Sequence, residues 1–169
     1  IYKTDLDTIY AVNGLSFGLN RGETLGLVGE TGAGKTTTAL AILRLLPERT
    51  GKIASGKVVF NGQDLLTLSE HAMRDVRGEK ISMIFQDPMT SLNPIMNVGE
   101  QIAEALQLHN DNRMTNAEIQ EKTDAVLEMV GIPASRRREY PHQFSGGMKQ
   151  RVVIAIALAC EPDLLIADE

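Results

Sequence analysis

The sequence predicts an α/β fold, and three features of the chain carry this prediction. Short apolar segments of strand type alternate with longer segments of helical periodicity. A glycine-rich loop at 29–34 lies between an apolar strand and a helix. A second apolar run, 163–167, leads directly into Asp168 and Glu169. Apolar strands that end in a glycine-rich loop or in carboxylates are typical of parallel sheets with a ligand crevice at that edge.

The first part of the chain is predicted to be rich in β-structure. The expected strands span 9–12, 16–19, 23–28 and 57–60. Asn13-Gly14 and Asn61-Gly62 are turn dipeptides of the kind that joins such strands. Apolar residues at helical spacing then predict a helix over 36–46, which Pro47 ends.

The middle of the chain changes to a helical pattern. The expected helices span 69–76, 98–108, 117–130 and 145–159, and a buried strand is expected at 81–85. We therefore predict one domain over 1–169, in which a core of 1–86 and 144–169 carries an inserted helical subdomain at 87–143. The basic run 136–138 is expected to be a solvated turn.

Composition and charge limit the classes of function. Acidic residues outnumber basic ones, 22 against 17, which gives a net charge of −5 and disfavours a nucleic-acid partner. No segment approaches the run of about 18 apolar residues that a membrane span needs, so any membrane role is expected to be peripheral. The single Cys160 cannot form an internal disulfide, which fits a reducing, cytoplasmic setting.

The strongest motif is GETGAGKT at 29–36, which matches the pattern G-x-x-x-x-G-K-[ST] between a strand and a helix. Its glycines let backbone N–H groups surround phosphates, and the helix N-terminus adds a partial positive charge. We expect Lys35 to bridge the β- and γ-phosphates and the Thr36 hydroxyl to bind Mg²⁺. The expected nucleotide contacts are Gly29, Glu30, Thr31, Gly32, Ala33, Gly34, Lys35, Thr36 and Thr37. A chance glycine-rich turn is the alternative.

Two further segments supply groups that a phosphate-binding loop requires. Asp168 is predicted to hold the metal through a water, and Glu169 to act as general base toward the attacking water. Ser145, Gly146 and Gly147 open a helix and form a second anion-binding nest. Such a nest makes physical sense if it binds the γ-phosphate of a nucleotide held by another subunit. The alternative is that Ser145 is only an N-cap.

In this order, the phosphate-binding loop, Gln86, the Ser-Gly-Gly turn and the Asp168-Glu169 pair resemble the ABC transporter ATPase family over the whole chain. The segment IFQDPMTSLNP at 84–94 resembles the peptide and nickel importer branch, close to its dipeptide and oligopeptide ATPase subunits. The resemblance implies a P-loop NTPase (RecA-like) core with an N-terminal antiparallel β portion and an inserted helical subdomain. It also implies ATP hydrolysis that powers peptide import, by a subunit peripheral to the cytoplasmic face of the membrane.

The resemblance also implies roles for residues and partners. Gln86 would contact Mg²⁺ and the attacking water, with a plain core-edge amide as the alternative. Tyr2 would stack on adenine, and Tyr10 is the second candidate. The segment 87–97 would meet the transmembrane permease through Met89, Leu92 and Ile95, unless these side chains pack internally. The other implied partners are a second ATPase subunit across the ATP sandwich and, indirectly, an extracellular binding protein.

The sequence departs from the family pattern in several places. Phe144 stands where the family usually has Leu, and Met148 where it usually has Gln. The chain stops before the D-loop and the switch histidine, and His142 does not take that place. We therefore expect a fragment that turns over ATP poorly. Two alternatives stay open, a nucleotide-binding fragment without turnover and an ABC ATPase outside transport. The cargo, whether dipeptide, oligopeptide or nickel, is open as well.

Overall fold

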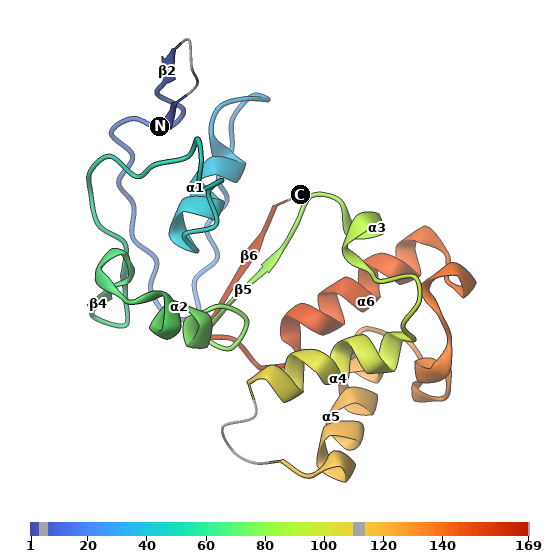
Figure 1. Cartoon of the computed structure of the whole chain (residues 1–169). Coiled ribbons are helices and arrows are strands. Elements are labelled where there is room, and N and C mark those ends of the chain that lie inside the picture. The colour runs from blue at the N-terminus through green and yellow to red at the C-terminus, as the bar shows by residue number, and fades with distance from the viewer. Residues whose placement is uncertain (4–6, 110–113, 169) are drawn as a thin grey trace. The chain divides into compact units, whose positions relative to one another are not determined.

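The computed structural model describes residues 1–3, 7–109 and 114–168. The chain forms two compact units, an N-terminal unit (Ile1–Ser69) and a C-terminal unit (Glu70–Glu169), and each is described by itself. Figure 1 labels the elements of both units. None of the helices among the described residues is long and apolar enough to cross a membrane.

The strands of the N-terminal unit are short and antiparallel. β1 (Tyr2–Lys3) pairs with β2 (Thr8–Ile9), and β3 (Val59–Phe60) pairs with β4 (Gln63–Asp64). The turn between β3 and β4 has positive φ at both central residues, 48° at Asn61 and 81° at Gly62. This backbone matches the twist of a tight hairpin, so the predicted Asn-Gly turn is confirmed.

α1 (Lys35–Ile42) follows the glycine-rich loop, as predicted, but ends before the expected Leu46. Leu43 caps the helix, and Arg44 takes a left-handed conformation with φ 54°. The Arg44 guanidinium donates to the backbone oxygens of Leu65 and Leu68, at 3.3 and 2.7 Å. Leu65 begins the short helix η1 (Leu65–Thr67). These tertiary bonds hold a backbone conformation that local sequence does not favour, and they end the helix early.

Two of the predicted strands, 16–19 and 23–28, are wrong, because the structure describes no strand in either range. The apolar side chains that suggested them are exposed, Val28 by 94%. A strand needs a neighbour to complete its backbone hydrogen bonds. Among the described residues, all strand pairs join other segments, so this part of the chain has no such neighbour.

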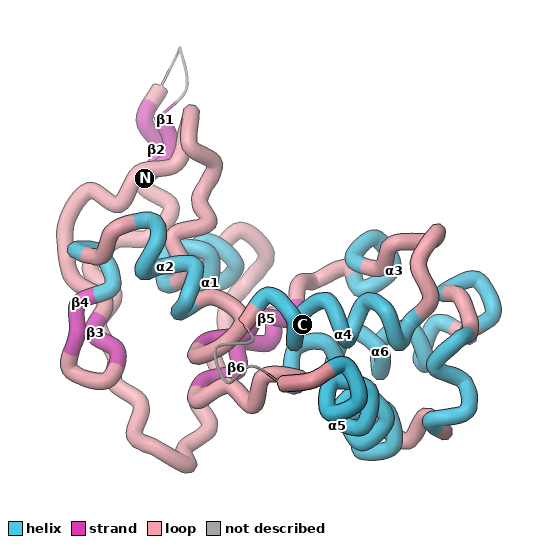
Figure 2. The backbone as a smooth tube through the Cα atoms, turned by 60° about the horizontal axis from the view of Figure 1, so that its bottom comes forward, coloured by secondary structure: helices cyan, strands magenta, loops and turns pink. Residues whose placement is uncertain are grey.

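The C-terminal unit contains two of the predicted strands, and the structure pairs them in parallel. β5 (Ile81–Ile84) and β6 (Leu164–Ala167) run side by side in Figures 1 and 2, with Ile81 opposite Leu164 and Ile84 opposite Ala167. β5 is largely buried, as expected for an apolar strand without alternation. The mixture of helices with a parallel pair confirms the predicted α/β class.

Helices make up most of the C-terminal unit. They are α2 (Glu70–Val76), α3 (Pro88–Ser91), α4 (Val98–Leu108), α5 (Asn116–Met129), η2 (Ala134–Arg138), η3 (Pro141–Gln143) and α6 (Gly146–Leu158). α4 and α5 each begin with a capping box, Asn97 with Glu100 and Thr115 with Glu118. In such a box each side chain bonds the other residue's backbone N–H, which fixes where the helix starts.

The core of the C-terminal unit lies where α4, α5 and α6 pack together. Ile102, Leu127, Ile132 and Val152 are completely buried in it. Burial of an aliphatic side chain of this size contributes about 1.5–3 kcal/mol. The helices from α3 to η3 fall within the range expected for an inserted subdomain. The division of the chain into a core and an insert stays a prediction.

Candidate functional site

The glycine-rich loop requires glycine at Gly34 for two separate reasons. Gly34 has φ 89°, in the left-handed region, and directly precedes α1. A Cβ atom at this position would lie 2.5 Å from the backbone oxygen of Ala11. Gly32 also has positive φ, 84°, but a Cβ there would meet nothing within 4 Å. The loop is therefore shaped by glycine conformation at both positions and by close packing at Gly34.

Lys35 folds back over the loop from the first residue of α1. Its Nζ donates to the backbone oxygens of Gly29 and Glu30, at 2.7 and 3.1 Å. The loop closes further through the Ala33 N–H, which donates to Glu30 O at 3.0 Å. An ammonium group held by two neutral carbonyls can exchange them for phosphate oxygens, which carry more negative charge.

The first turn of α1 presents a row of threonines. Thr38 Oγ1 donates to Gly34 O at 2.8 Å, which anchors the loop to the helix. Thr37 Oγ1 lies 3.3 Å from the hydroxyl of Tyr2. Thr36 is exposed at the start of the helix. The structure thus brings Tyr2, the loop and the threonines together in one unit, while Tyr10 is 69% exposed.

A cavity of about 240 Å³ lies beside the loop in the N-terminal unit. Its walls combine apolar side chains with the start of α1. The lining residues are Ala11, Val12, Asn13, Leu15, Leu27, Val28, Ala33, Gly34, Lys35 and Thr38. A hollow lined by both polar and apolar groups, Lys35 among them, suits a ligand that has both an apolar and an anionic part.

The C-terminal unit brings Gln86 and Asp168 to one edge of the parallel pair. Asp168 directly follows β6 and is buried, with 9% exposure, and its N–H donates to Ile84 O at 2.9 Å. Gln86 lies two residues beyond the end of β5 and is exposed. Ile84 pairs with Ala167, so the segments that follow β5 and β6 leave the sheet at the same level. Glu169 lies outside the described residues.

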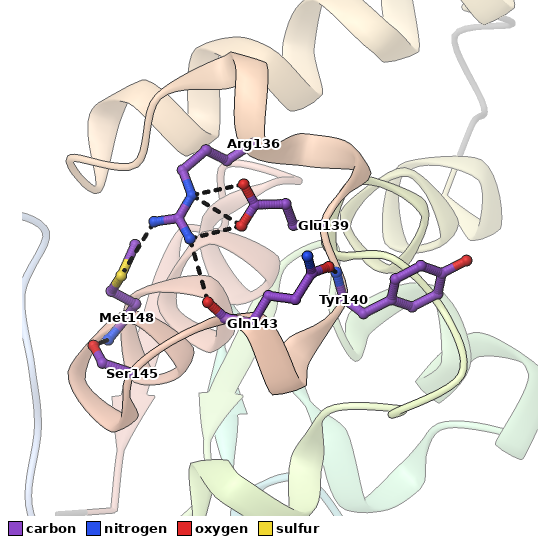
Figure 3. A network of polar contacts seen from close by, with 6 residues as sticks. All are labelled: Arg136, Glu139, Tyr140, Gln143, Ser145 and Met148. Atoms are coloured by element: carbon purple, nitrogen blue, oxygen red, sulfur yellow. Dashed lines mark hydrogen bonds and ion pairs between the residues drawn. The ribbon is translucent and has the colours of Figure 1, made fainter.

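The Ser-Gly-Gly turn opens α6. Ser145 is the N-cap, and its Oγ accepts from the Met148 N–H at 3.4 Å (Figure 3). The N-cap interpretation of Ser145 is therefore confirmed for the isolated chain. A Cβ at Gly146 or Gly147 would meet nothing within 4 Å, and neither residue has positive φ. The fold of this chain does not itself require glycine at these positions.

The segment 87–97 divides its apolar side chains between the core and the surface. Leu92 is buried, so internal packing accounts for it and its predicted role as a surface contact is wrong. Ile95 is 82% exposed, as a contact residue would be. The side chain of Met89 lies outside the described residues.

The residues predicted to bind Mg²⁺ offer oxygen donors, which this ion prefers. They are the Thr36 hydroxyl, the Gln86 amide and the Asp168 carboxylate. In the part of the chain that the structure describes, no three His, Cys, Asp or Glu side chains gather into a metal site. Mg²⁺ is commonly held by one or two carboxylates together with substrate phosphates. Thr36 belongs to the N-terminal unit, and Gln86 and Asp168 belong to the C-terminal unit. Each offers a type of donor that fits an ion bound with a triphosphate.

A family model described as ABC transporter matches residues 12–169, which is most of the chain. The chain belongs to the ABC transporter family. It is 56% identical over 94% of its length to a probable peptide ABC transporter ATP-binding protein of Sinorhizobium fredii, and 53% identical over 99% to the oligopeptide transport ATP-binding protein OppD of Escherichia coli. The chain spans about half the length of these relatives, 48% and 49%. The family predicted from the motifs is confirmed.

Solved structures support the same assignment for the fold. The ABC transporter chain superposes with a TM-score of 0.85 on the dimeric, post-hydrolysis state of the ATP-binding cassette MJ0796 bound to ADP and Pi. The two are 28% identical, and the match covers 98% of this chain and 68% of the cassette. The predicted P-loop core is thereby confirmed.

The basic run 136–138 of this ABC transporter chain is not the solvated turn that its sequence predicts. Arg136 forms an ion pair with Glu139, and Arg137 forms one with Asp124. The spacing of Arg136 and Glu139, three residues apart, was the available signal. It indicates a local pair, but not that this pair also touches the residues around Ser145.

Proposed function

We propose that this chain is the nucleotide-binding part of an ATPase that powers peptide import through a membrane permease. The observation that carries the proposal is the segment 29–36, in which left-handed glycines lead into α1 and Lys35, the first residue of that helix, folds back over the loop. The high identity to proteins named as peptide and oligopeptide transport subunits supports peptides as the cargo.

The residues of the N-terminal unit bind and orient the triphosphate. Backbone N–H groups of the loop face the phosphates, and Lys35 leaves the Gly29 and Glu30 carbonyls to bridge the β- and γ-phosphates. Thr37 donates toward the α-phosphate. Tyr2 stacks on the adenine, and its hydroxyl contact with Thr37 supports this choice over Tyr10.

The residues of the C-terminal unit prepare the attacking water. Asp168 would hold the metal through a water, and Gln86 would contact both the metal and the attacking water. When bound with the triphosphate, Mg²⁺ would neutralise charge that develops on the β- and γ-phosphates. Glu169 takes a proton from the attacking water as general base. The exit of β5 and β6 at one level supports the joint action of Gln86 and Asp168.

A second ATPase subunit completes the nucleotide site in this proposal. Ser145, Gly146 and Gly147 face the γ-phosphate of a nucleotide bound by the partner. Packing within this chain does not require glycine at Gly146 or Gly147. This supports a ligand that approaches these two residues from outside the chain. Dimeric states of the related cassette MJ0796 support the same arrangement.

The proposed docking region for the permease is 87–97, at the cytoplasmic face of the membrane. The buried Gln101 amide holds this segment, accepting from the Asn93 N–H at 2.9 Å and donating to the backbone oxygens of Asn93 and Met96, both at 3.0 Å. A braced loop that projects Ile95 supports a role in docking. An extracellular binding protein takes part only indirectly.

Calorimetry and turnover of the full-length protein test the proposed function. We expect MgATP to bind with measurable heat and to be hydrolysed, and Lys35→Ala to lose both. Lys57→Ala, which changes an exposed lysine in the same unit, serves as the matched control and should match the wild type. Equal MgATP binding by the wild type and Lys35→Ala would refute the assignment of the loop.

A further inference from the structure

Arg136 forms the centre of a cluster that joins η2 to the start of α6 (Figure 3). Its Nε donates to both carboxylate oxygens of Glu139 at 3.0 Å, and its Nη2 donates to Glu139 Oε2 at 2.6 Å. Arg136 and Glu139 are only part-exposed, 29% and 31%. A planar guanidinium that meets a carboxylate through several bonds is held in orientation as well as in place.

The same guanidinium touches residues on both sides of the Ser145–Gly147 turn. Before the turn, Nη2 donates to Gln143 O at 3.4 Å, and Cζ lies 4.4 Å from the centroid of the buried Phe144 ring. After the turn, Nη1 lies 3.4 Å from Met148 Sδ. The backbone N–H of Met148 is the group that Ser145 Oγ caps. Arg136 therefore holds both ends of the turn.

Glu139 connects this cluster to the start of α4. The backbone oxygen of Glu139 accepts from the Val98 N–H at 2.9 Å, at the first residue of the helix. The Glu139 N–H donates to Arg136 O, also at 2.9 Å. Val98 itself is completely buried. The carboxylate that orients Arg136 is thus anchored to the helical core rather than to a free loop.

We propose that Arg136 is a positioning residue that fixes the direction of the Ser145–Gly147 backbone N–H groups toward the γ-phosphate of the partner subunit's nucleotide. The inference rests on the proposed function, because that nucleotide is the ligand of the turn. Open space around Gly146 and Gly147 leaves the turn without packing of its own on that side. Its orientation therefore depends on the groups at its two ends, and Arg136 contacts both.

The test compares three variants in the full-length protein together with its partner ATPase. Arg136→Met keeps side-chain length but removes every donor, and Arg136→Lys keeps the charge without the planar fork. Arg138→Met is the matched control, since Arg138 is an exposed arginine of the same η2 segment. For each variant we measure kcat and KM for MgATP, the Kd of the separate subunit for MgATP, and Tm.

We expect Arg136→Met to lower kcat by about 10- to 100-fold, the scale on which misplaced groups affect catalysis. The Kd for MgATP should stay within about twofold, because the phosphate-binding loop is untouched. Arg138→Met should match the wild type in every measurement. Glu169→Gln is expected to block hydrolysis, so that dimer closure can be measured by itself. In this background, Arg136→Met should increase the ATP concentration needed for dimer closure by about tenfold.

Two results would overturn the inference. One is a kcat and a closing ATP concentration for Arg136→Met that equal those of the wild type. The other is a fall in kcat matched by an equal loss of folded protein, which indicates a purely structural role. Should Arg136→Met fail to fold, Arg136→Lys decides the question by the same measurements. If the wild-type protein does not bind MgATP, the proposed function itself is refuted.

Discussion

The hydroxyl oxygen of Tyr2 lies 3.3 Å from Thr37 Oγ1, which joins β1 to the first turn of α1 across 35 positions of sequence. This contact places an aromatic ring beside the helix that follows the phosphate-binding loop. Tyr10, the other candidate, is mostly exposed. The contact supports Tyr2, which the sequence already favoured over Tyr10, and its role toward adenine stays a prediction.

Substitution of Tyr2 tests its role toward adenine. Stacking between a base and an aromatic ring contributes about 1–3 kcal/mol, so Tyr2→Ala should weaken MgATP binding by about tenfold or more. Tyr2→Phe keeps the ring and should retain the affinity, and Tyr10→Ala should leave it unchanged. Calorimetric titration of the full-length protein measures all three. The reverse pattern, with loss only in Tyr10→Ala, would transfer the role to Tyr10.

Gly34 and Gly32 provide a matched pair for the phosphate-binding loop. Both have positive φ, and an alanine in that region costs about 1–2 kcal/mol. Only at Gly34 would the new Cβ also meet a backbone oxygen, that of Ala11 at 2.5 Å. We expect Gly34→Ala to lower the free energy of unfolding clearly more than Gly32→Ala and to abolish MgATP binding. Urea denaturation and calorimetry measure the two effects, and equal destabilisation by both would contradict the close packing at Gly34.

Much of the fold was predictable because its signals are local. The helices α4 and α5 begin at capping boxes whose residues stand three apart in the sequence. The sequence also predicted carboxylates at the end of the strand before Asp168, and the structure pairs that strand with β5, so that Gln86 and Asp168 follow the same edge. These features need only neighbouring residues or a topological rule.

The features that escaped prediction depend on distant parts of the chain. The segments 16–19 and 23–28 have strand composition, but a strand forms only where another strand completes its ladder. α1 ends early because Arg44 bonds carbonyls more than twenty residues away. Arg136 lies in a basic run of the sequence, but it contacts Phe144 and Met148, which follow it by 8 and 12 positions. Composition alone specifies none of these partners.

The ion pair between Arg136 and Glu139 has a pH signature. Hydrogen bonds from the Arg136 guanidinium lower the pKa of Glu139 below its usual range. A lowered carboxyl pKa means that the pair stabilises the fold fully above the ordinary value of about 4.3 and loses this effect as pH falls through the lowered pKa. We expect Arg136→Met to raise the pKa of Glu139 back toward the ordinary value, measured by carboxyl NMR titration.

Glu118 serves as the internal control for that titration. Its pKa is also lowered, by hydrogen bonds from the Thr115 backbone and side chain within the α5 capping box. Arg136→Met should leave the pKa of Glu118 unchanged, whereas Thr115→Ala should raise it and leave Glu139 unaffected. A shift of both carboxyls in Arg136→Met would indicate a general change of the unit rather than loss of one ion pair.

Variants of Gln101 and Ile95 distinguish two roles of the 87–97 segment, its contribution to stability and its proposed contact with the permease. Gln101→Leu removes three hydrogen bonds from a buried site and should destabilise the protein by about 1–3 kcal/mol, because backbone groups of Asn93 and Met96 lose their partner. Ile95→Ser changes an exposed side chain and should leave Tm unchanged while weakening assembly with the permease. Leu108→Ser, at another exposed position, is the control. If Ile95→Ser and Leu108→Ser assemble with the permease equally well, Ile95 is not part of the docking surface.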